Sequence, residues 1–425
     1  MIRTVNPGIV RGRLSPPSSK SYTHRALVAA HLCGRPSFIL RPLDSNDTRA
    51  TACGLAALGS RVRFATNRWQ IRPARVARGR LRTIQCGESG TTLRFLTALA
   101  ALSDRPIRLT GQGRLPSRPM SDLYDALRAL GARISPEREG RALPCTIHGP
   151  ISAGRIDVRV DETSQYLSAL LLALPRVEGR SEIRLRGPSV SRTYIDATAA
   201  VLRAYGVRIV SRPRGYRIDG PQPFRATSFT VPGDASSAAY FWAAAALTGG
   251  GVTVTGIDRR WPQADLALLD ILSRMGASVR RTRSEIEVSG PLLRGISVDL
   301  TNSPDLYPLV GVLAAGVPGR RSHLRGAAHV RLKESDRFAE TARIVRAMGA
   351  WVGTARGELG ILGTAIPRSL SLRGLDDHRL VMSAAVGALT AGSPSHLGDA
   401  RAVRKSFPGF WDALAGVVHG RGVAS

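Results

Sequence analysis

The chain has 425 residues, which is enough for two or three domains with separate hydrophobic cores. Its N-terminus has no apolar run of the kind found in signal peptides, so we expect a cytoplasmic globular protein. The formal net charge is +30, but the arginines are spread along the whole chain and aromatic residues are only 5%. This distribution favours an ordinary arginine-rich surface over a nucleic-acid-binding protein, with attraction of anionic small molecules as a consequence.

Cysteine spacing and hydropathy exclude two further classes of protein. The four cysteines form neither a C-x-x-C pair nor a cluster with histidine, which argues against a zinc site or a disulfide framework. The most apolar stretch, AAYFWAAAAL at 238–247, is about half of the roughly 20 residues that a bilayer span requires. We therefore predict a buried helix there and no membrane association.

Five segments of the chain end in the same way. Each is an apolar-periodic helix followed by a glycine and then by a β-rich run, and the glycines recur at intervals of 70 to 75 residues: Gly59, Gly131, Gly206, Gly276 and Gly349. Glycine suits the position after a helix because it adopts positive φ without strain. A sixth copy ends in a degenerate form at 410–418.

A second feature recurs with the same period, a short polar segment that runs directly into an Ala/Leu-rich helix. The six copies lie at 18–30, 87–100, 161–174, 233–247, 302–315 and 376–389. Ser, Thr and Asp in these segments are residues that cap helix N-termini. Strand patterns lie between the helices at 156–160, 181–187, 251–256 and 284–290. The chain is therefore predicted to be an α/β protein of six strand–helix–strand–helix–strands units, arranged as two domains of three.

The polar helix starts and the lysines together predict an anion-binding site. A helix N-terminus offers unpaired N–H groups and about half a positive charge. By itself a polar start is explained by helix capping. However, of 61 lysine and arginine residues only Lys20, Lys333 and Lys405 are lysine, and all three lie in polar motifs. Because lysine is a compact point charge and arginine a wide planar fork, the three places are predicted to be constrained sites.

Ten motifs, in order along nearly the whole chain, resemble those of the 5-enolpyruvylshikimate-3-phosphate (EPSP) synthase family of enolpyruvyl transferases. They are SSKSYTHRAL, GESGTTLRFL, RLPSRPM, TSQYLSALL, SVSRTYID, GDASSAAYF, SPDLYP, RLKESDR, DDHRLVM and KSFPGFW. One such match would be weak evidence, whereas ten in sequence are specific. All three lysines coincide with active-site positions of the family.

The resemblance implies a particular fold and reaction. The fold is α/β, with two globular domains of three βαβαββ units each, an inside-out α/β barrel architecture and an active site in the interdomain cleft. One domain would be 1–17 with 232–425, and the other 18–231. The reaction moves the enolpyruvyl group of phosphoenolpyruvate (PEP) onto the 5-hydroxyl of shikimate 3-phosphate and releases phosphate. No metal or organic cofactor is implied, and we expect a monomer.

The resemblance also assigns two sets of binding residues. The PEP carboxylate and phosphate would be held by Lys20, Gly90, Arg118, Gln165, Arg337, Arg379 and Lys405. Planar arginine forks suit such oxygens. Shikimate 3-phosphate would be held by Lys20, Ser21, Arg25, Thr163, Ser164, Gln165, Ser191, Tyr194, Asp305 and Lys333. For Thr163 and Ser164, helix capping is an equally good explanation, and one side chain can do both.

Lys20, Asp305 and Glu334 are the residues that the resemblance makes catalytic. Asp305 would be the base at the 5-hydroxyl and Glu334 the proton donor to the enol methylene. From the residues alone, Asp305 is also explained by a first-turn acid in a helix, and Glu334 by a salt bridge with Arg331 or Arg337. We leave open how the three groups share the proton transfers. Asp377 and His378 are expected to orient Arg379.

Two positions depart from the family pattern. Glu88 stands where many members have Asn, and an acid beside an anion site would need an arginine partner, for which we suggest Arg118. His329 stands where some members have Asn, so its role is open. Thr163 replaces a common Ser and keeps the hydroxyl.

Other functions predict different features. The related UDP-N-acetylglucosamine enolpyruvyl transferases usually carry a reactive cysteine in the loop before the RPM segment, and the loop TGQGRLPSRPM has none. A basic nucleic-acid-binding protein would account for the charge but not for the lysine positions. Every expected charged group is present, which argues only weakly against an inactive homologue used as a binding module, so this alternative stays open.

Overall fold

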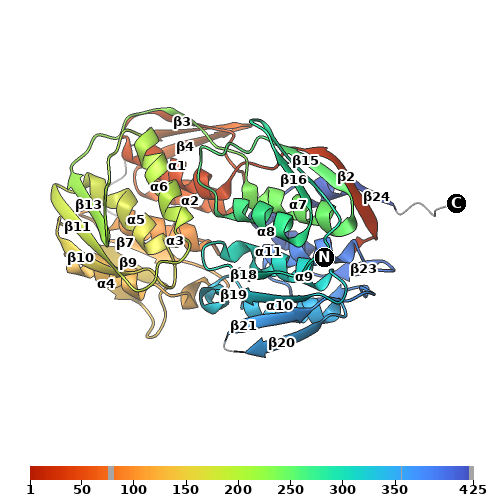
Figure 1. The fold of residues 1–425 in the computed structure, drawn as a ribbon. Helices are drawn as coiled ribbons and strands as arrows, with labels where there is room; N and C mark the ends of the chain where they lie inside the picture. The colour runs from red at the N-terminus through yellow and green to blue at the C-terminus, as the bar shows by residue number, and fades with distance from the viewer. Residues whose placement is uncertain (75–80, 356, 421–425) are drawn as a thin grey trace. The chain divides into compact units, whose positions relative to one another are not determined.

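The computed structural model describes residues 1–74, 81–355 and 357–420 (Figure 1). The chain forms two compact units. Unit 1 comprises Met1–Pro17 and Gly233–Ser425, and unit 2 comprises Ser18–Pro232.

The strands of unit 2 form three four-stranded sheets. Their orders are β14(Ser228–Thr230)-β3(Ser37–Leu40)-β5(Arg68–Pro73)-β4(Ser60–Ala65), β6(Arg82–Gln85)-β7(Ile107–Thr110)-β9(Cys145–His148)-β8(Arg133–Pro136), and β10(Arg155–Arg159)-β11(Gly179–Arg186)-β13(Gly215–Gly220)-β12(Val210–Arg212). In each sheet the first pair is parallel and the other pairs are antiparallel. Parallel strands need a crossover connection, and in the second and third of these sheets the segment between the first two strands contains a helix.

The helices of unit 2 are α1(Lys20–Leu32), α2(Asn46–Ala57), α3(Gly90–Ala100), α4(Ser121–Ala129), α5(Gln165–Ala173) and α6(Thr193–Ala204), with short 3₁₀ turns η1(Leu115–Ser117) and η2(Leu174–Arg176). Helix α3 packs against α5, and α1 packs against α2 and α6. Nearly every residue of α1, α3 and α5 is buried. Such a helix belongs to the interior of its domain, with its N-terminus as the part that can meet a ligand.

Unit 1 repeats this pattern. Its sheets are β16(Ser278–Arg281)-β17(Glu285–Ser289)-β15(Gly251–Thr255)-β2(Gly8–Leu14)-β24(Val418–Gly420), β18(Ser297–Asp299)-β19(Arg321–Arg325)-β21(Glu358–Leu362)-β20(Trp351–Ala355), and β1(Arg3–Val5)-β23(Ser395–Leu397)-β22(Ser371–Leu372). Its helices are α7(Ala235–Thr248), α8(Ala267–Met275), α9(Tyr307–Ala315), α10(Arg337–Ala347), α11(His378–Ala388) and α12(Phe410–Ala415). The 3₁₀ turns are η3(Ala264–Leu266), η4(Pro304–Leu306), η5(Ala328–Leu332) and η6(Ala400–Lys405). Helices α7, α9 and α11 pack together in the core of this unit.

Two strands pair with partners from the other end of the chain. Strand β2 directly precedes α1 in sequence, but it pairs in parallel with β15, which begins 237 residues after the end of β2. Strand β14 directly precedes α7 but pairs in parallel with β3. Each of these two repeats therefore receives its first strand from a distant segment. This exchange makes the chain pass between the units twice, at 17/18 and at 232/233.

The predicted helices and their ends are confirmed. The six polar-started helices are α1, α3, α5, α7, α9 and α11. The five helix-ending glycines all have positive φ, between +80° and +109°. In the sixth copy Gly416 has φ −69°, so that helix ends without the left-handed residue. The four predicted strands correspond to β10, β11, β15 and β17.

The apolar stretch 238–247 lies in α7 and is almost entirely buried, as predicted. Across residues 1–74, 81–355 and 357–420, no helix is long and apolar enough to cross a membrane.

Candidate active site

In unit 2, three helices begin at predicted binding residues. Lys20 is the first residue of α1, Gly90 of α3 and Gln165 of α5. The Ser89 hydroxyl caps α3 by accepting from the Thr92 N–H at 3.1 Å, and the Thr163 hydroxyl accepts from the Gln165 N–H at 3.2 Å. Thr163 therefore caps the helix, which was predicted as an alternative to substrate binding. The Ser164 side chain makes no capping bond. These helix starts favour anions.

Lys20 pairs with a carboxylate that the sequence did not reveal. Its Nζ lies 3.1 Å from Oδ2 of Asp47, which is buried at the start of α2. Helix α2 begins with a capping box in which Ser45 and Thr48 exchange hydrogen bonds, and this fixes the position of Asp47. Asp47 therefore holds the lysine at the beginning of α1.

Arg25 is buried, and its guanidinium hydrogen-bonds to uncharged oxygens. Its guanidinium donates to the Thr198 hydroxyl at 2.8 Å and to the backbone carbonyls of Ser21 and Tyr194, each at 3.0 Å. Burial lowers the pKa of Arg25 to about 10, with a smaller opposing influence of Tyr22 and Tyr194. At neutral pH this is a buried cation held mainly by dipoles, a suitable place for an anion.

Gly90 leaves room for two arginines. A Cβ at this position would lie 2.6 Å from Nη1 of Arg118 and 3.0 Å from Nη1 of Arg94. Both arginines are buried. Arg94 also donates to Oε1 of Gln165 at 2.7 Å and so orients this side chain, while Gln165 donates to the Thr91 hydroxyl at 3.3 Å. The structure therefore brings together Gly90, Arg118 and Gln165 of the predicted PEP-binding set.

Two more predicted residues of unit 2 lie beside Arg25, and Ser191 lies next to one of them in the chain fold. Ser21 and Tyr194 contact Arg25 through their carbonyls, and the Tyr194 ring lies beside its guanidinium at 6.0 Å. Ser191 is buried and has a left-handed backbone with φ +55°, which is uncommon for serine. Its carbonyl accepts from the Tyr194 N–H at 3.1 Å, which starts the turn into α6.

In unit 1, Arg337 is the centre of a charged cluster. It is 1% exposed. Its guanidinium donates to Asp377 at 2.7 Å and 3.3 Å, to Asp305 at 2.6 Å and to Glu334 at 2.9 Å. Burial alone would lower the pKa of Arg337, but these three carboxylates raise it above its ordinary value. One buried cation thus brings both predicted proton carriers, Asp305 and Glu334, to the same place.

Asp305 is held by a second arginine. Its Oδ2 lies 2.6 Å from Nη2 of Arg379. Burial raises the pKa of Asp305, but Arg379, Arg337 and Lys333 outweigh this and hold it well below its usual range. Asp305 lies in η4, in the first turn before α9, as expected for an acid at a helix start. It is ionised at neutral pH.

Asp377 caps α11, the helix that begins at His378. Its carboxylate accepts from the backbone N–H of Arg379 at 2.9 Å, and its side-chain contacts include Arg337, the Ser335 hydroxyl and Nδ1 of His378. The Arg379 guanidinium lies against Asp305 and Asp265. The orientation of Arg379 by Asp377 and His378 stays a prediction.

Lys333 and Lys405 are both half-buried at the ends of 3₁₀ turns, Lys333 after η5 and Lys405 as the last residue of η6. His329 is buried in η5, and its Nε2 lacks a hydrogen-bond partner. Burial, with Lys333, lowers the pKa of His329 to about 4, so it is neutral at physiological pH.

Glu88 is exposed, and its carboxylate lies next to Gly113 in the following loop. The suggested pairing with Arg118 stays a prediction.

Three charged residues of the site escaped sequence reasoning: Asp47, Arg94 and Asp265. Arg94 could have been found, because it lies one helical turn after Gly90 within GESGTTLRFL and so shares its face of the helix. Asp47 and Asp265 contact the site only through residues far away in sequence, and the local pattern carries no signal for such contacts.

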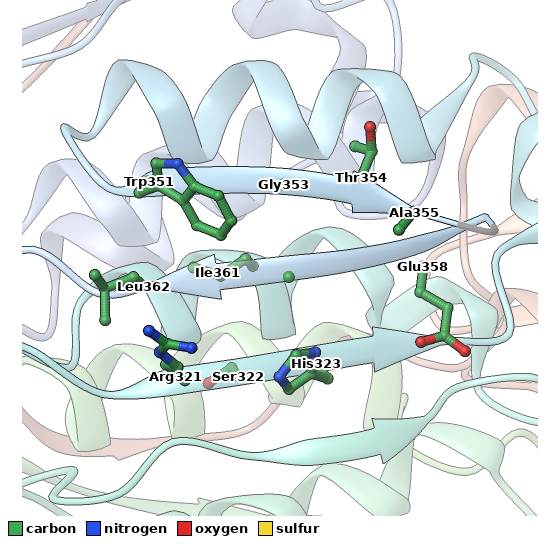
Figure 2. Close-up of a pocket in the computed structure, with 11 residues that line it drawn as sticks. Arg321, Ser322, His323, Trp351, Gly353, Thr354, Ala355, Glu358, Ile361 and Leu362 are labelled. Carbon is green, nitrogen blue, oxygen red and sulfur yellow. The ribbon is translucent and has the colours of Figure 1, made fainter.

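A hollow of about 520 Å³ lies elsewhere in unit 1, on the face of the β18-β19-β21-β20 sheet (Figure 2). Gly353 and Gly360 are register partners on its floor, and the Trp351 indole lies over Gly353. None of the predicted site residues lines this hollow.

The whole chain has the fold of an enolpyruvyl transferase. It superimposes on EPSP synthase from Acinetobacter baumannii with a TM-score of 0.82 at 24% identity, covering 99% of this chain and 98% of the other. The enolpyruvyl transferase NikO from Streptomyces tendae gives a TM-score of 0.77 at 17% identity, with 98% and 97% covered. At these identities the likeness concerns the fold.

Sequence comparison shows the family. The model of EPSP synthase (3-phosphoshikimate 1-carboxyvinyltransferase) matches residues 5–414. The 3-phosphoshikimate 1-carboxyvinyltransferase of Methanoculleus marisnigri is 38% identical over 98% of this chain and 99% of its own length. That of Methanocorpusculum labreanum is 36% identical over 94% of each. The chain belongs to the EPSP synthase family, and its activity is that of the family, in the shikimate pathway of aromatic amino acid biosynthesis.

Proposed function

We propose that the chain transfers the enolpyruvyl group of PEP to the 5-hydroxyl of shikimate 3-phosphate, with Asp305 and Glu334 as proton carriers on either side of Arg337. The observation that carries the assignment is the shared guanidinium, which binds both carboxylates within 3 Å. Addition to PEP requires one proton to leave the attacking hydroxyl and one to reach the enol carbon. A carboxylate that takes the first proton and a carboxylic acid that gives the second, both next to one guanidinium, meet this requirement.

The binding residues of the proposal come from both units. PEP contacts Lys20, Gly90, Arg118, Gln165, Arg337, Arg379 and Lys405. Shikimate 3-phosphate contacts Lys20, Ser21, Arg25, Thr163, Ser164, Gln165, Ser191, Tyr194, Asp305 and Lys333. The proposal assigns 1–17 with 232–425 to one domain and 18–231 to the other, and residues of both domains bind the substrates. We also propose that the enzyme is a monomer and acts in the cytoplasm.

PEP binding is proposed to change the basicity of Asp305. A carboxylate whose pKa is held low by two arginines is a poor base, and Asp305 is bound by both Arg337 and Arg379. The same two arginines are assigned to PEP. When its anionic groups take these donors, the pKa of Asp305 rises toward its ordinary value, and the carboxylate becomes a base only in the complex.

Phosphate release tests the function. The purified protein is mixed with PEP and shikimate 3-phosphate, and UDP-N-acetylglucosamine serves as the parallel acceptor. We expect phosphate only with shikimate 3-phosphate. Release only with the nucleotide sugar would support enolpyruvyl transfer but contradict shikimate 3-phosphate as the acceptor. Release with neither acceptor would contradict the proposed function.

Replacing Lys333 by arginine should lower kcat/KM by about 100-fold without unfolding the protein, since a misplaced contact near the reacting atoms has an effect of this size. The reason is that the planar fork cannot occupy the volume of the compact ammonium beside Asp305 and His329. Steady-state kinetics and circular dichroism check this. Arg346→Lys, an exposed exchange of the same two residue types on α10, serves as the control. Near-normal turnover of K333R would contradict the prediction that this position requires lysine rather than arginine.

Replacing Gly90 by alanine should weaken PEP binding about tenfold and leave shikimate 3-phosphate binding within about twofold. The new Cβ would lie 2.6 Å from Arg118 and force this guanidinium away from its place. Titration calorimetry with each ligand measures the two affinities. Gly392→Ala is the matched control, because a Cβ at Gly392 meets nothing within 4 Å. Equal losses for both ligands would show that Gly90 is not at the PEP site.

A further inference from the structure

Asp265 is a buried acid in a rigid place. It lies in η3 and is 1% exposed. The two residues before it are fixed by hydrogen bonds. The Gln263 side chain accepts from the Ala235 N–H at 2.8 Å and donates to the Gly233 carbonyl at 2.9 Å. The Ala264 carbonyl accepts from the Ser303 hydroxyl at 2.9 Å. The carboxylate is therefore held against the start of α7 and against the segment that carries Asp305.

The local fold does not explain this carboxylate. Neither of its oxygens makes a well-formed hydrogen bond, and the Ser236 hydroxyl beside it lowers its pKa less than Arg379 does. A buried acid without hydrogen bonds destabilises a fold unless a charge compensates it. The compensating charge is Arg379, whose Nη1 lies 3.9 Å from Oδ2 of Asp265 while its Nη2 lies 2.6 Å from Asp305. One guanidinium thus stands between two carboxylates, one in the interior and one at the site.

We infer that Asp265 is a positioning residue for Arg379, which it holds from the buried side so that the other edge of the guanidinium can pass from Asp305 to the anionic group of PEP. The inference rests on the proposed assignment of Arg379 to PEP. A negative charge behind Arg379 competes with Asp305 for the same cation. This competition weakens the Arg379–Asp305 pair and so favours the exchange of Asp305 for substrate.

The surroundings of Asp265 make this role dependent on pH. Burial, opposed by Arg379 and reinforced by Asp305 and Asp234, raises the pKa of Asp265 to about 7. The pKa of Asp305 stays well below its usual range, and burial raises that of Tyr240, whose hydroxyl faces Arg379, to about 12. Of these groups, Asp265 is the one whose charge changes near neutral pH. At acidic pH Asp265 is uncharged and no longer competes with Asp305 for the Arg379 guanidinium.

The test is Asp265→Asn, which keeps the size of the side chain and removes its charge. KM for each substrate is measured by phosphate release between pH 5.5 and 8.5. At pH 8 we expect KM for PEP to rise about tenfold, the effect of one charge-assisted contact, with KM for shikimate 3-phosphate within about twofold. At pH 6 the variant and wild type should converge, because Asp265 of the wild type is then protonated. Ionisation of PEP itself is common to both proteins and cancels in the ratio.

Asp270→Asn is the matched control, since it removes an equal charge from the following helix α8 at an exposed position, and we expect no change in either KM. A D265N variant with equal rises in both KM values, or with a ratio to wild type that is constant across pH, would overturn the inference. If D265N does not fold, Asp265→Ser removes the charge with a smaller side chain, and the same expectations apply. A wild-type protein that releases no phosphate would contradict the proposed function instead, so the two failures are distinguishable.

Discussion

Replacing Asp305 by asparagine should lower kcat by about 10²–10⁴-fold, the usual contribution of a positioned proton carrier. The amide keeps the shape of the side chain but cannot accept the hydroxyl proton. Arg337 keeps Asp377 and Glu334 as partners in this variant, so the fold should survive. Steady-state turnover, together with the thermal unfolding midpoint, separates the loss of chemistry from a loss of structure.

The control for this prediction is Asp258→Asn, the same change of chemistry at a partly exposed carboxylate that pairs with the exposed Arg260. We expect its turnover to equal that of the wild type. If D305N keeps more than a tenth of wild-type kcat while unfolding at the same temperature, Asp305 is not the base, and its place beside Arg337 has to be explained by binding alone.

Replacing Arg337 by methionine should lower the free energy of unfolding at pH 7 by about 3–5 kcal/mol and abolish turnover, because breaking a buried ion pair leaves uncompensated charge behind. Asp377, which is fully buried, and the largely buried Asp305 and Glu334 lose their common donor. Chemical denaturation measures the difference. Arg343→Met serves as the control, since its pair with Glu340 on the same helix is 39% exposed on the arginine side and should contribute no more than about 1 kcal/mol.

The loss in R337M should depend on pH in a defined direction. The pKa of Asp305 is lower in the folded protein than in the unfolded chain, partly through Arg337. Such a group stabilises the fold above its unfolded pKa of about 4, and this contribution disappears as the pH falls. The difference between wild type and R337M should therefore be largest at neutral pH and shrink at acidic pH. A difference that stays constant from pH 7.5 to pH 4 would mean that the lost arginine mattered through packing.

Local patterns carried much of the fold. Helix starts depend on Ser, Thr or Asp next to an apolar period, and helix ends on a glycine that adopts positive φ, so both are visible within a few residues of sequence. This is why the six core helices, the five left-handed glycines such as Gly59 and Gly349, and the buried nature of 238–247 could be predicted. In the same way, the rarity of lysine in the sequence predicted constrained sites at Lys20, Lys333 and Lys405.

Partners could not be predicted in the same way. The sequence indicated that Glu334 could pair with Arg331 or Arg337, because residues three positions apart in sequence can lie close together, and the pair with Arg337 is present. It did not indicate that Asp305 and Asp377 would meet the same guanidinium from 32 and 40 residues away. Nor did it indicate that the Arg379 side chain would lie between Asp305 and Asp265.

The sequence by itself determined the six repeats, the starts and ends of their core helices, the family and the residue types of the site. Only the tertiary structure decided that β2 and β14 exchange partners, that Asp47 holds Lys20, and that Arg337 and Arg379 hold Asp305 between them. The physical reason is the range of the interactions. Capping and helical periodicity act between residues a few positions apart, whereas strand pairing and ion pairing depend on distances in space that exist only once the repeats have packed.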